Sequence, residues 1–311
     1  MDILLCGSFD DAERDEWLDA LRSACPDANW HLSPSADEAQ RIEAAVVANP
    51  PPGALRHLPN LRLIQSLWAG VDRLMLDASL PAGVPVARMV DPAMNQAMAQ
   101  TAVWATLSLH RGFFRYAAQQ QATRWQQWPQ RRADEVRVTI LGLGQMGRCC
   151  ASRLAGLGYT VAGWSSRPTE LDGIETCNGN AALRGLLQRT DVLINLLPLT
   201  PQTEGLLDTP LFNALPRGAG LVNLARGAHL VEDALLEALD SGQIGHAMLD
   251  VFRHEPLPAE HPFWRHPNVT VLPHVAAMTD ARSAANVVAQ NLQALRDGRP
   301  LANLVDPTRG Y

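Results

Sequence analysis

Three residues in the second half of the sequence are of types that together can reduce a carbonyl group next to a carboxylate. Arg226, Glu255 and His274 each follow an apolar run that is typical of a strand. An arginine can bind a carboxylate through two hydrogen bonds and polarise the adjacent ketone oxygen. An unperturbed histidine has a pKa of about 6.5, so His274 can supply the proton that the developing alkoxide needs. The set predicts hydride transfer from a nicotinamide cofactor, with His274 as the proton donor.

Two carboxylates accompany this arginine and histidine. A carboxylate beside a histidine favours the imidazolium form, so we expect Glu255 to keep His274 protonated near neutral pH. Asp250, at the end of its own apolar run, is better placed to hold the amide of a nicotinamide. Taken singly, these residues have simpler interpretations: an exposed arginine, a helix-capping aspartate, a solvated glutamate and a histidine satisfied by the backbone. Their joint occurrence at strand ends favours the catalytic interpretation.

A glycine-rich segment upstream can bind the phosphates of a nucleotide. Residues 138–147 read VTILGLGQMG, an apolar run that opens into G-x-G-x-x-G. The first glycine allows a tight turn, the second lets a pyrophosphate approach, and the third lets the helix pack on the strand. The pattern alone is weak, and a purely structural turn is the alternative. The strand-like run before it and the helical stretch after it favour a cofactor site, with the residues Gly142, Gly144, Gln145, Met146 and Gly147.

The segment that selects the cofactor lacks the expected acid. An aspartate or glutamate that binds the adenosine ribose normally follows the fingerprint after about 20 residues. Here the next apolar run ends in Ser165, Ser166 and Arg167. A carboxylate would repel a 2′-phosphate, whereas hydroxyl groups and a guanidinium can bind it. We therefore expect NADPH as the preferred cofactor and NADH as the alternative. The simpler interpretation is that Arg167 points into solvent while a later carboxylate folds back toward the ribose.

Two blocks of alternating strand-like and helix-like segments can position these residues. Such alternation predicts parallel sheets covered by helices, and ligands of such sheets bind beyond the carboxyl ends of the strands. The expected fold class is α/β, with two doubly wound parallel-sheet domains, a Rossmann cofactor domain and a flavodoxin-like substrate domain, and a cleft between them. The predicted strands are 2–6, 44–48, 62–67 and 85–89 in the first block, and 137–141, 160–164, 192–196, 220–223, 246–250 and 269–272 in the second.

Two predicted helices link the blocks. The stretch 93–121 has few helix breakers, which predicts one long helix that serves as a connector or an oligomer arm. A second helix is expected from Asp280 to about Arg296, ending near Gly298. Its position suggests that the chain returns to the first domain. The predicted domains are therefore 1–98 with 281–311, and 99–280.

Composition excludes several classes of protein. The net charge of −6 argues against a general nucleic-acid-binding protein. No uncharged apolar stretch approaches the roughly 20 residues of a membrane span, and the N-terminus is typical of a first strand, not a signal peptide. Five cysteines without a C-x-x-C pair suit reduced thiols. We expect a cytoplasmic protein without a metal site and without nucleic-acid or membrane partners.

Several motifs resemble those of the D-isomer-specific 2-hydroxyacid dehydrogenase family along the whole chain. They are NLARG at 223–227, LDVF-x-x-EPL at 249–257 and PHVA at 273–276, behind GLGQMG. The segments LINLLPLTPQT and NLARGAHLVEDALLEALDSG and the terminal RGY narrow the resemblance to members that reduce glyoxylate and hydroxypyruvate. The resemblance implies Arg226, Glu255 and His274 as the catalytic residues. It also implies a homodimer built largely on the cofactor domains.

The same resemblance implies further binding residues. In the family, backbone N–H groups of a loop in the first domain bind the substrate carboxylate, and residues 67–72 match that loop. We therefore expect Trp68, Ala69 and Gly70 to bind substrate together with Arg226 and His274. Trp68 would restrict the pocket to small keto acids; core packing explains it equally well. Outside the glycine loop, the expected cofactor-binding residues are Trp164, Ser165, Ser166, Arg167, Leu197, Pro198, Leu224, Ala225 and Asp250.

The leading hypothesis is NADPH-dependent reduction of small 2-keto acids, glyoxylate to glycolate and hydroxypyruvate to glycerate. A dehydrogenase for another, larger or phosphorylated hydroxy acid is an alternative, but the arginines of the first block are scattered: Arg56, Arg62, Arg73 and Arg88. A dinucleotide-sensing interaction protein of the same superfamily is a second alternative, although the chain lacks the Pro/Ser-rich tails of such scaffolds. Three other histidines are interpreted as non-catalytic: His229, His246 and His254.

Overall fold

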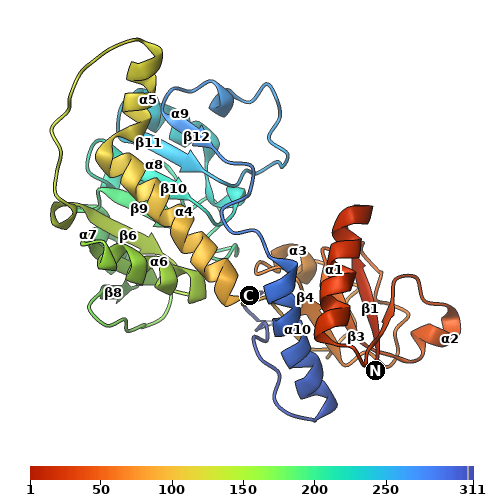
Figure 1. The fold of residues 1–311 in the computed structure, drawn as a ribbon. Helices are drawn as coiled ribbons and strands as arrows, with labels where there is room; N and C mark the ends of the chain where they lie inside the picture. Colours follow the sequence, from red (N-terminus) through yellow and green to blue (C-terminus); the bar gives the residue numbers. More distant parts are fainter. Residues whose placement is uncertain (307) are drawn as a thin grey trace. The chain divides into compact units, whose positions relative to one another are not determined.

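The chain folds around two parallel β-sheets, each in a separate unit (Figure 1). The computed structural model describes residues 1–306 and 308–311. Unit 1 consists of Met1–Met94 with Thr279–Tyr311, and unit 2 consists of Asn95–Met278. The family resemblance assigns substrate binding to unit 1 and dinucleotide binding to unit 2, and this assignment stays a prediction.

Unit 1 is built on a five-stranded sheet in the order β2-β1-β3-β4-β5, with all strands parallel. This is the flavodoxin-like order of a doubly wound sheet, as expected. β3 lies at the centre, and its run IEAAVVA is buried almost throughout because helices cover both faces of such a sheet. The strands are β1 (Asp2–Gly7), β2 (Asn29–His31), β3 (Ile42–Ala48), β4 (Leu63–Ser66) and β5 (Val86–Ala87).

The two longest helices of unit 1 come from opposite ends of the chain and pack against each other (Figure 1). Each is capped by an aspartate: Asp10 accepts a hydrogen bond from the backbone N–H of Glu13, and Asp280 accepts one from that of Arg282. The later helix is the predicted one, and left-handed Gly298 follows its end. The helices are α1 (Asp11–Ala24), α2 (Ala36–Ala39), α3 (Asp72–Met75) and α10 (Ala281–Arg296).

Unit 2 is built on a seven-stranded parallel sheet in the order β12-β11-β10-β9-β6-β7-β8. The order reverses between β6 and β9, and a dinucleotide binds beyond the carboxyl ends of the strands at such a reversal. The strands are β6 (Arg137–Leu141), β7 (Thr160–Ser165), β8 (Glu175–Asn178), β9 (Val192–Asn195), β10 (Ala219–Asn223), β11 (Ile244–Leu249) and β12 (Val269–Val271).

Alternate residues of these strands enter two separate hydrophobic clusters. Leu221 packs on one face, with α7, α8 and α9, whereas its neighbour Val222 packs on the other, with α4 and α6. The helices are α4 (Pro92–Arg111), α5 (Phe113–Gln121), α6 (Gln145–Gly156), α7 (Asn180–Leu187), α8 (Thr209–Ala214) and α9 (Glu232–Asp240), with 3₁₀ turns η1 (Ala133–Glu135), η2 (Gly227–His229) and η3 (Pro262–Trp264).

The prediction of one continuous helix over 93–121 is wrong. Gly112, at φ 70° and ψ 31°, separates α4 from α5. This left-handed conformation cannot continue an α-helix, and glycine adopts it without the steric penalty of a side chain. None of the helices in the described part of the chain is long and apolar enough to cross a membrane.

Candidate active site

The glycine loop joins β6 to α6, and its three glycines meet different surroundings. A Cβ on Gly142, at φ +98°, would lie 2.7 Å from the carbonyl oxygen of Leu196, and one on Gly147 would lie 1.8 Å from that of Gly142. A Cβ on Gly144 would have no described atom within 4 Å. Gly144 precedes α6, whose first N–H groups have no partner within the helix. Gly142 and Gly147 are therefore packed against backbone, whereas Gly144 leaves space at the helix N-terminus, where a pyrophosphate would fit. Gln145 and Met146 are the first residues of that helix.

The loop after β7 is shaped by its own hydroxyl groups. Ser165 Oγ donates to the carbonyl oxygen of Arg167 at 2.5 Å, and Thr169 Oγ1 donates to the same oxygen at 3.3 Å. The Ser165 hydroxyl is thus used to turn the loop, and the exposed residues that remain for a phosphate are Ser166 and Arg167. Trp164 is buried, and its Nε1 donates to the carbonyl oxygen of Gly179 at 3.0 Å. Its side chain is therefore part of the core beneath the loop.

Two buried asparagines, which the sequence analysis did not single out, hold the loops after β9 and β10. Asn195 and Asn223 are register partners at the ends of these strands, and Asn195 Nδ2 donates to Asn223 Oδ1 at 3.0 Å. Asn195 Oδ1 accepts the backbone N–H of Leu197, and Asn223 Oδ1 accepts that of Ala225. The signal was a polar amide at the end of each of two apolar strands. These bonds fix both segments that were predicted to line the cofactor site.

Arg226 follows Leu224 and Ala225, which are both buried. Its Nη1 donates to the carbonyl oxygen of Ala225 at 2.7 Å. The next residue, Gly227, packs directly on the backbone of the neighbouring loop, because a Cβ there would lie 1.8 Å from the carbonyl carbon of Phe252. The half-buried guanidinium is therefore carried by a turn that is held from two sides.

His274 and Glu255 form a hydrogen-bonded pair. His274 Nδ1 lies 2.8 Å from Glu255 Oε2, and Glu255 Oε1 accepts the backbone N–H of Phe252 at 2.9 Å. Burial alone would raise the pKa of Glu255, but the bonds from His274 and Phe252 and the charge of Arg226 leave the pKa below its ordinary value. The His274 side chain is 50% exposed. Its Nδ1 is engaged by the carboxylate, so Nε2 is the nitrogen that can serve a substrate.

Asp250 organises the backbone around this histidine. Its carboxylate accepts the backbone N–H groups of Val275 at 2.8 Å and Ala276 at 3.0 Å, and its carbonyl oxygen accepts that of His274 at 2.9 Å. His274 adopts a left-handed φ of 57°, which costs energy for a residue with a Cβ. Burial raises the pKa of Asp250, although these hydrogen bonds oppose the shift. Asp250 therefore stabilises the strained loop that presents His274.

Comparisons with known proteins place the chain in a family. Residues 103–276 match the NAD binding domain of D-isomer specific 2-hydroxyacid dehydrogenases. A glyoxylate/hydroxypyruvate reductase A from Yersinia enterocolitica is 40% identical over the full length of both chains. The chain belongs to the D-isomer specific 2-hydroxyacid dehydrogenase family. It is accordingly an NAD(P)-dependent oxidoreductase, and the family predicted from NLARG, LDVF-x-x-EPL and PHVA is confirmed.

Solved structures of related dehydrogenases share the whole fold. A D-isomer specific 2-hydroxyacid dehydrogenase from Xanthobacter autotrophicus Py2, in complex with NADPH and MES, is 38% identical, with a TM-score of 0.94 over 100% of this chain and 99% of its own. An NADPH-dependent glyoxylate/hydroxypyruvate reductase from Sinorhizobium meliloti, in complex with NADP and sulfate, is 35% identical, with a TM-score of 0.92 over the same shares.

The predicted substrate segment of this dehydrogenase follows β4 in unit 1, at the carboxyl edge of the five-stranded sheet. Trp68 donates its backbone N–H to Ser66 Oγ, and its carbonyl oxygen accepts the N–H of Met89. Its ring meets that of Trp17 edge-on, with centroids 6.2 Å apart. Trp68 is half-buried, as are Ala69 and Gly70. The segment is thus held by its backbone and by one aromatic contact.

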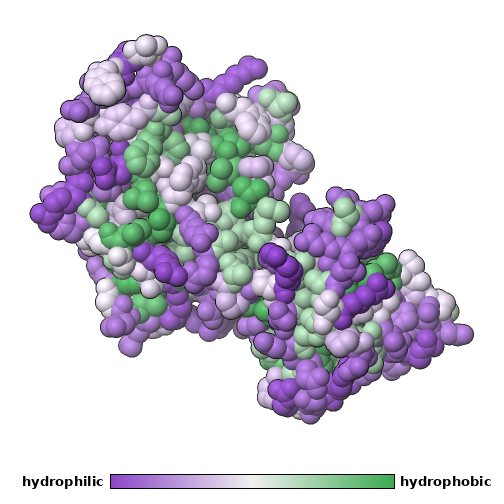
Figure 2. All heavy atoms as spheres, in the orientation of Figure 1, coloured by the Kyte–Doolittle hydropathy of each residue, from purple (hydrophilic) through white to green (hydrophobic). Residues whose placement is uncertain are grey.

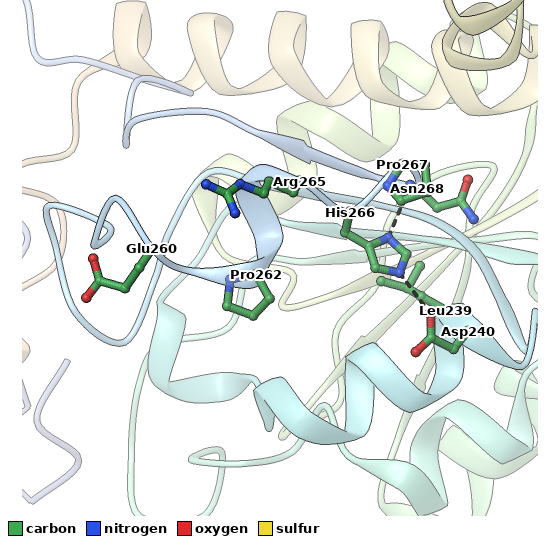
Figure 3. Close-up of a pocket in the computed structure, with 8 residues that line it drawn as sticks. All are labelled: Leu239, Asp240, Glu260, Pro262, Arg265, His266, Pro267 and Asn268. Carbon is green, nitrogen blue, oxygen red and sulfur yellow. Dashed lines mark hydrogen bonds and ion pairs between the residues drawn. The ribbon is translucent and has the colours of Figure 1, made fainter.

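A hollow of about 570 Å³ in unit 2 contains none of the predicted site residues (Figure 3). His266 lies in its wall, with Nδ1 accepting the backbone N–H of Asn268 and Nε2 3.4 Å from Asp240 Oδ1. These residues precede β12 or end α9, so the hollow lies at the amino edge of the sheet. Ligands of open α/β sheets bind beyond the opposite, carboxyl edge. The hollow therefore lies at the edge of the sheet opposite to the predicted site.

The other histidines occupy structural or exposed positions. His246 Nε2 is 2.9 Å from Thr270 Oγ1, its ring stacks on Phe114, and burial lowers its pKa to about 4. His254 is exposed beside Glu255. His229 is fully buried. Within residues 1–306 and 308–311, no group of three His, Cys, Asp or Glu side chains can hold a metal ion.

Proposed function

We propose that the chain is an NADPH-dependent reductase of small 2-keto acids, converting glyoxylate to glycolate and hydroxypyruvate to glycerate. The observation that carries this proposal is the His274–Glu255 pair, held at the carboxyl edge of the sheet whose first loop has the dinucleotide fingerprint. A relative of 40% identity is named for glyoxylate and hydroxypyruvate. The alternatives are another 2-hydroxy acid substrate and a dinucleotide-sensing protein without turnover.

The proposed chemistry divides among three side chains. When bound, NADPH supplies the hydride. Arg226 binds the keto acid through two hydrogen bonds and polarises the ketone oxygen. His274 then donates the proton on Nε2 to the alkoxide, while Glu255 holds Nδ1 and fixes the direction of the ring. Trp68, Ala69 and Gly70 remain the proposed binding segment for the substrate carboxylate, in unit 1.

The cofactor proposal rests on the loop after β7. Arg167 carries the positive charge of this loop, and the first carboxylate after it in the chain is Glu170, which is exposed. A guanidinium matches the geometry of a phosphate, whereas a carboxylate would repel it. Related structures contain NADPH or NADP, which supports the same choice. We infer that NADPH is preferred over NADH.

A kinetic comparison tests the proposal. The purified protein is assayed with NADPH and with NADH, each against glyoxylate, hydroxypyruvate and pyruvate, by following loss of the reduced cofactor. We expect turnover of glyoxylate and hydroxypyruvate with a higher kcat/KM for NADPH. Tight nucleotide binding without turnover of any keto acid would instead support the dinucleotide-sensing protein.

We also propose a homodimer formed through unit 2. Large apolar side chains reach the surface on α4, on α5 and in the segment that follows, and Figure 2 shows hydrophobic side chains gathered over α4. Such patches mark interaction surfaces. Light scattering should give the mass of two chains, and a single-chain mass would contradict the proposal. The large apolar residues exposed on this surface are Trp104, Phe113, Trp125 and Trp128.

The free cysteines support a reducing, cytoplasmic location for the protein.

A further inference from the structure

His229 is a fully buried histidine between two loops of the active-site edge. Its side chain has no exposed surface. Its Nδ1 lies 3.1 Å from the carbonyl oxygen of Arg226, and its Nε2 lies 3.2 Å from that of Pro198. The ring therefore spans from the turn that carries the predicted substrate arginine to a turn that was predicted to line the cofactor site.

The backbone of His229 is also held in place. Its N–H donates to the carbonyl oxygen of Arg226 at 3.3 Å, and its own carbonyl oxygen accepts the N–H of Leu207 at 2.9 Å. The carbonyl oxygen of Pro198 also accepts Thr203 Oγ1 at 2.7 Å. Each end of the imidazole thus meets a peptide whose orientation is already constrained. A ring between two constrained peptides sets the distance between the two turns.

Packing alone does not call for an imidazole at this position. The next residue in the chain, Leu230, and its β-bridge partner Leu207 belong to a hydrophobic cluster. An apolar ring would fill the same space without the cost of burying polar atoms, which is recovered only through hydrogen bonds. Both ring nitrogens lie within hydrogen-bond distance of carbonyl oxygens of site loops, and the neutral ring can donate its single N–H to one of them. Its chemistry is therefore directed at the geometry of those loops.

We propose that His229 is a positioning residue that fixes Arg226 for the keto acid and the Pro198 turn for the cofactor. This inference rests on the proposed function. Both ring nitrogens face backbone carbonyl groups, so the residue does not transfer a proton to substrate. It acts through Arg226, because the ring holds the peptide that carries the guanidinium.

The test replaces the ring and asks whether its effect depends on Arg226. His229→Phe keeps an aromatic ring, somewhat larger than imidazole, and removes the polar contacts of both ring nitrogens. Contacting residues are energetically coupled, and we expect the KM for glyoxylate to rise about tenfold. The Kd for NADPH should rise by less, about threefold or under. His246→Phe is the control, since His246 is a half-buried histidine of the same unit whose ring bonds Thr270.

A double-mutant cycle separates positioning from general damage. With Arg226→Lys as the background, adding His229→Phe should change the KM for glyoxylate less than about twofold, because the guanidinium that it positions is already gone. His229→Gln keeps one N–H donor and should recover part of the loss; it replaces the Phe variant in the cycle if that variant does not fold.

The outcomes separate the two proposals. A full tenfold effect that persists in the Arg226→Lys background would overturn the positioning role, and so would a His229→Phe variant with the kinetics of the His246→Phe control. A wild-type protein that turns over no keto acid would overturn the proposed function and this inference together. If the wild type turns over keto acids but the effects of His229→Phe and Arg226→Lys on the KM for glyoxylate are simply additive, the inference alone is overturned.

Discussion

His274 combines a strained backbone with a side chain that is aimed by a neighbour. Asp250 holds the backbone of residues 274–276, and Glu255 holds Nδ1 of the ring. Polar residues at strand ends were the basis for predicting a pair of Glu255 and His274, and the two side chains lie 2.8 Å apart. The sequence did not reveal that Asp250 supports the histidine loop, because hydrogen bonds to backbone N–H groups leave no pattern in side-chain types. Asn195 and Asn223 left a weak signal, a polar amide at the end of each of two apolar strands, whereas His229 faces backbone carbonyl groups, which leave no signal in the sequence.

Glu255→Gln tests the pair through its pH dependence. The pKa of Glu255 is below its ordinary value, so its stabilising effect is fully present above the ordinary pKa and is lost as the pH falls through the lowered one. Wild type and variant should therefore differ more in free energy of unfolding at neutral pH than in acid. Urea titrations at several pH values measure this. A difference that grows in acid would contradict the assignment.

Glu255→Gln should also lower kcat for glyoxylate by about 10² or more, since general acid catalysis contributes 10²–10⁴-fold. The KM for NADPH should change little, because Glu255 bonds His274 and Phe252.

Arg167→Ala tests the cofactor choice. A charge-assisted hydrogen bond is worth about 1.5–3 kcal/mol, so the KM for NADPH should rise roughly 10- to 100-fold while that for NADH stays nearly constant. Arg184→Ala removes an equally exposed arginine from α7 and serves as the control. Equal effects on both cofactors would remove Arg167 as the residue that binds the 2′-phosphate.

Gly144→Ala tests the open position of the glycine loop. A Cβ there meets no atom of the described chain within 4 Å, and φ is −70°, so the free energy of unfolding should change by less than about 0.5 kcal/mol. The methyl group would occupy the space of the pyrophosphate, so the Kd for NADPH should rise about tenfold or more. Fluorescence titration measures the Kd, and unchanged affinity would place the phosphates elsewhere.

At the level of elements, the predicted strands with long apolar runs were found, and two short edge strands were missed. β2 reads NWH and β8 reads ETCN, and both lie at sheet edges and are only partly buried. An edge strand pairs with a neighbour on one side only and is more exposed to solvent, so it needs few apolar residues and its sequence carries little signal. The break between α4 and α5 was missed because a single glycine inside a stretch with few helix breakers does not show whether it adopts a positive φ.

Gly112→Ala measures the cost of that break. Gly112 has a φ of 70°, and a Cβ there would meet no atom within 4 Å among the residues described, so backbone strain alone should destabilise the variant by about 1–2 kcal/mol. Gly185→Ala is the matched control inside α7 and should stabilise by up to about 1 kcal/mol. Urea unfolding compares the two, and a neutral Gly112→Ala would mean that α4 and α5 join without strain.

At the level of the whole molecule, unit 1 is assembled from both ends of the chain by buried polar contacts. Asn291 of α10 donates to Gln65 Oε1 of β4 at 2.7 Å and binds the backbone of Ala302 through both ends of its amide. Both amides are almost fully buried. The C-terminal segment is therefore joined to the sheet by satisfied hydrogen bonds as well as by apolar packing.

Asn291→Ala should lower the free energy of unfolding of unit 1 and leave that of unit 2 unchanged. Leaving the buried Gln65 Oε1 unsatisfied costs about 1–3 kcal/mol, while the Kd for NADPH should be unchanged because the proposed cofactor loops lie in unit 2. Asn286→Ala, an exposed position of the same helix, should be within about 0.5 kcal/mol of wild type. Calorimetry with and without NADPH measures both quantities; a large loss of NADPH affinity would show that the units are not independent.

The division of the chain has a consequence for synthesis on the ribosome. Unit 2 is a continuous segment, complete once Met278 has been made, whereas unit 1 lacks α10 until residues 279–311 emerge. Domains fold as units during translation. The seven-stranded sheet can therefore form while the five-stranded sheet, begun first, still waits for its last helix.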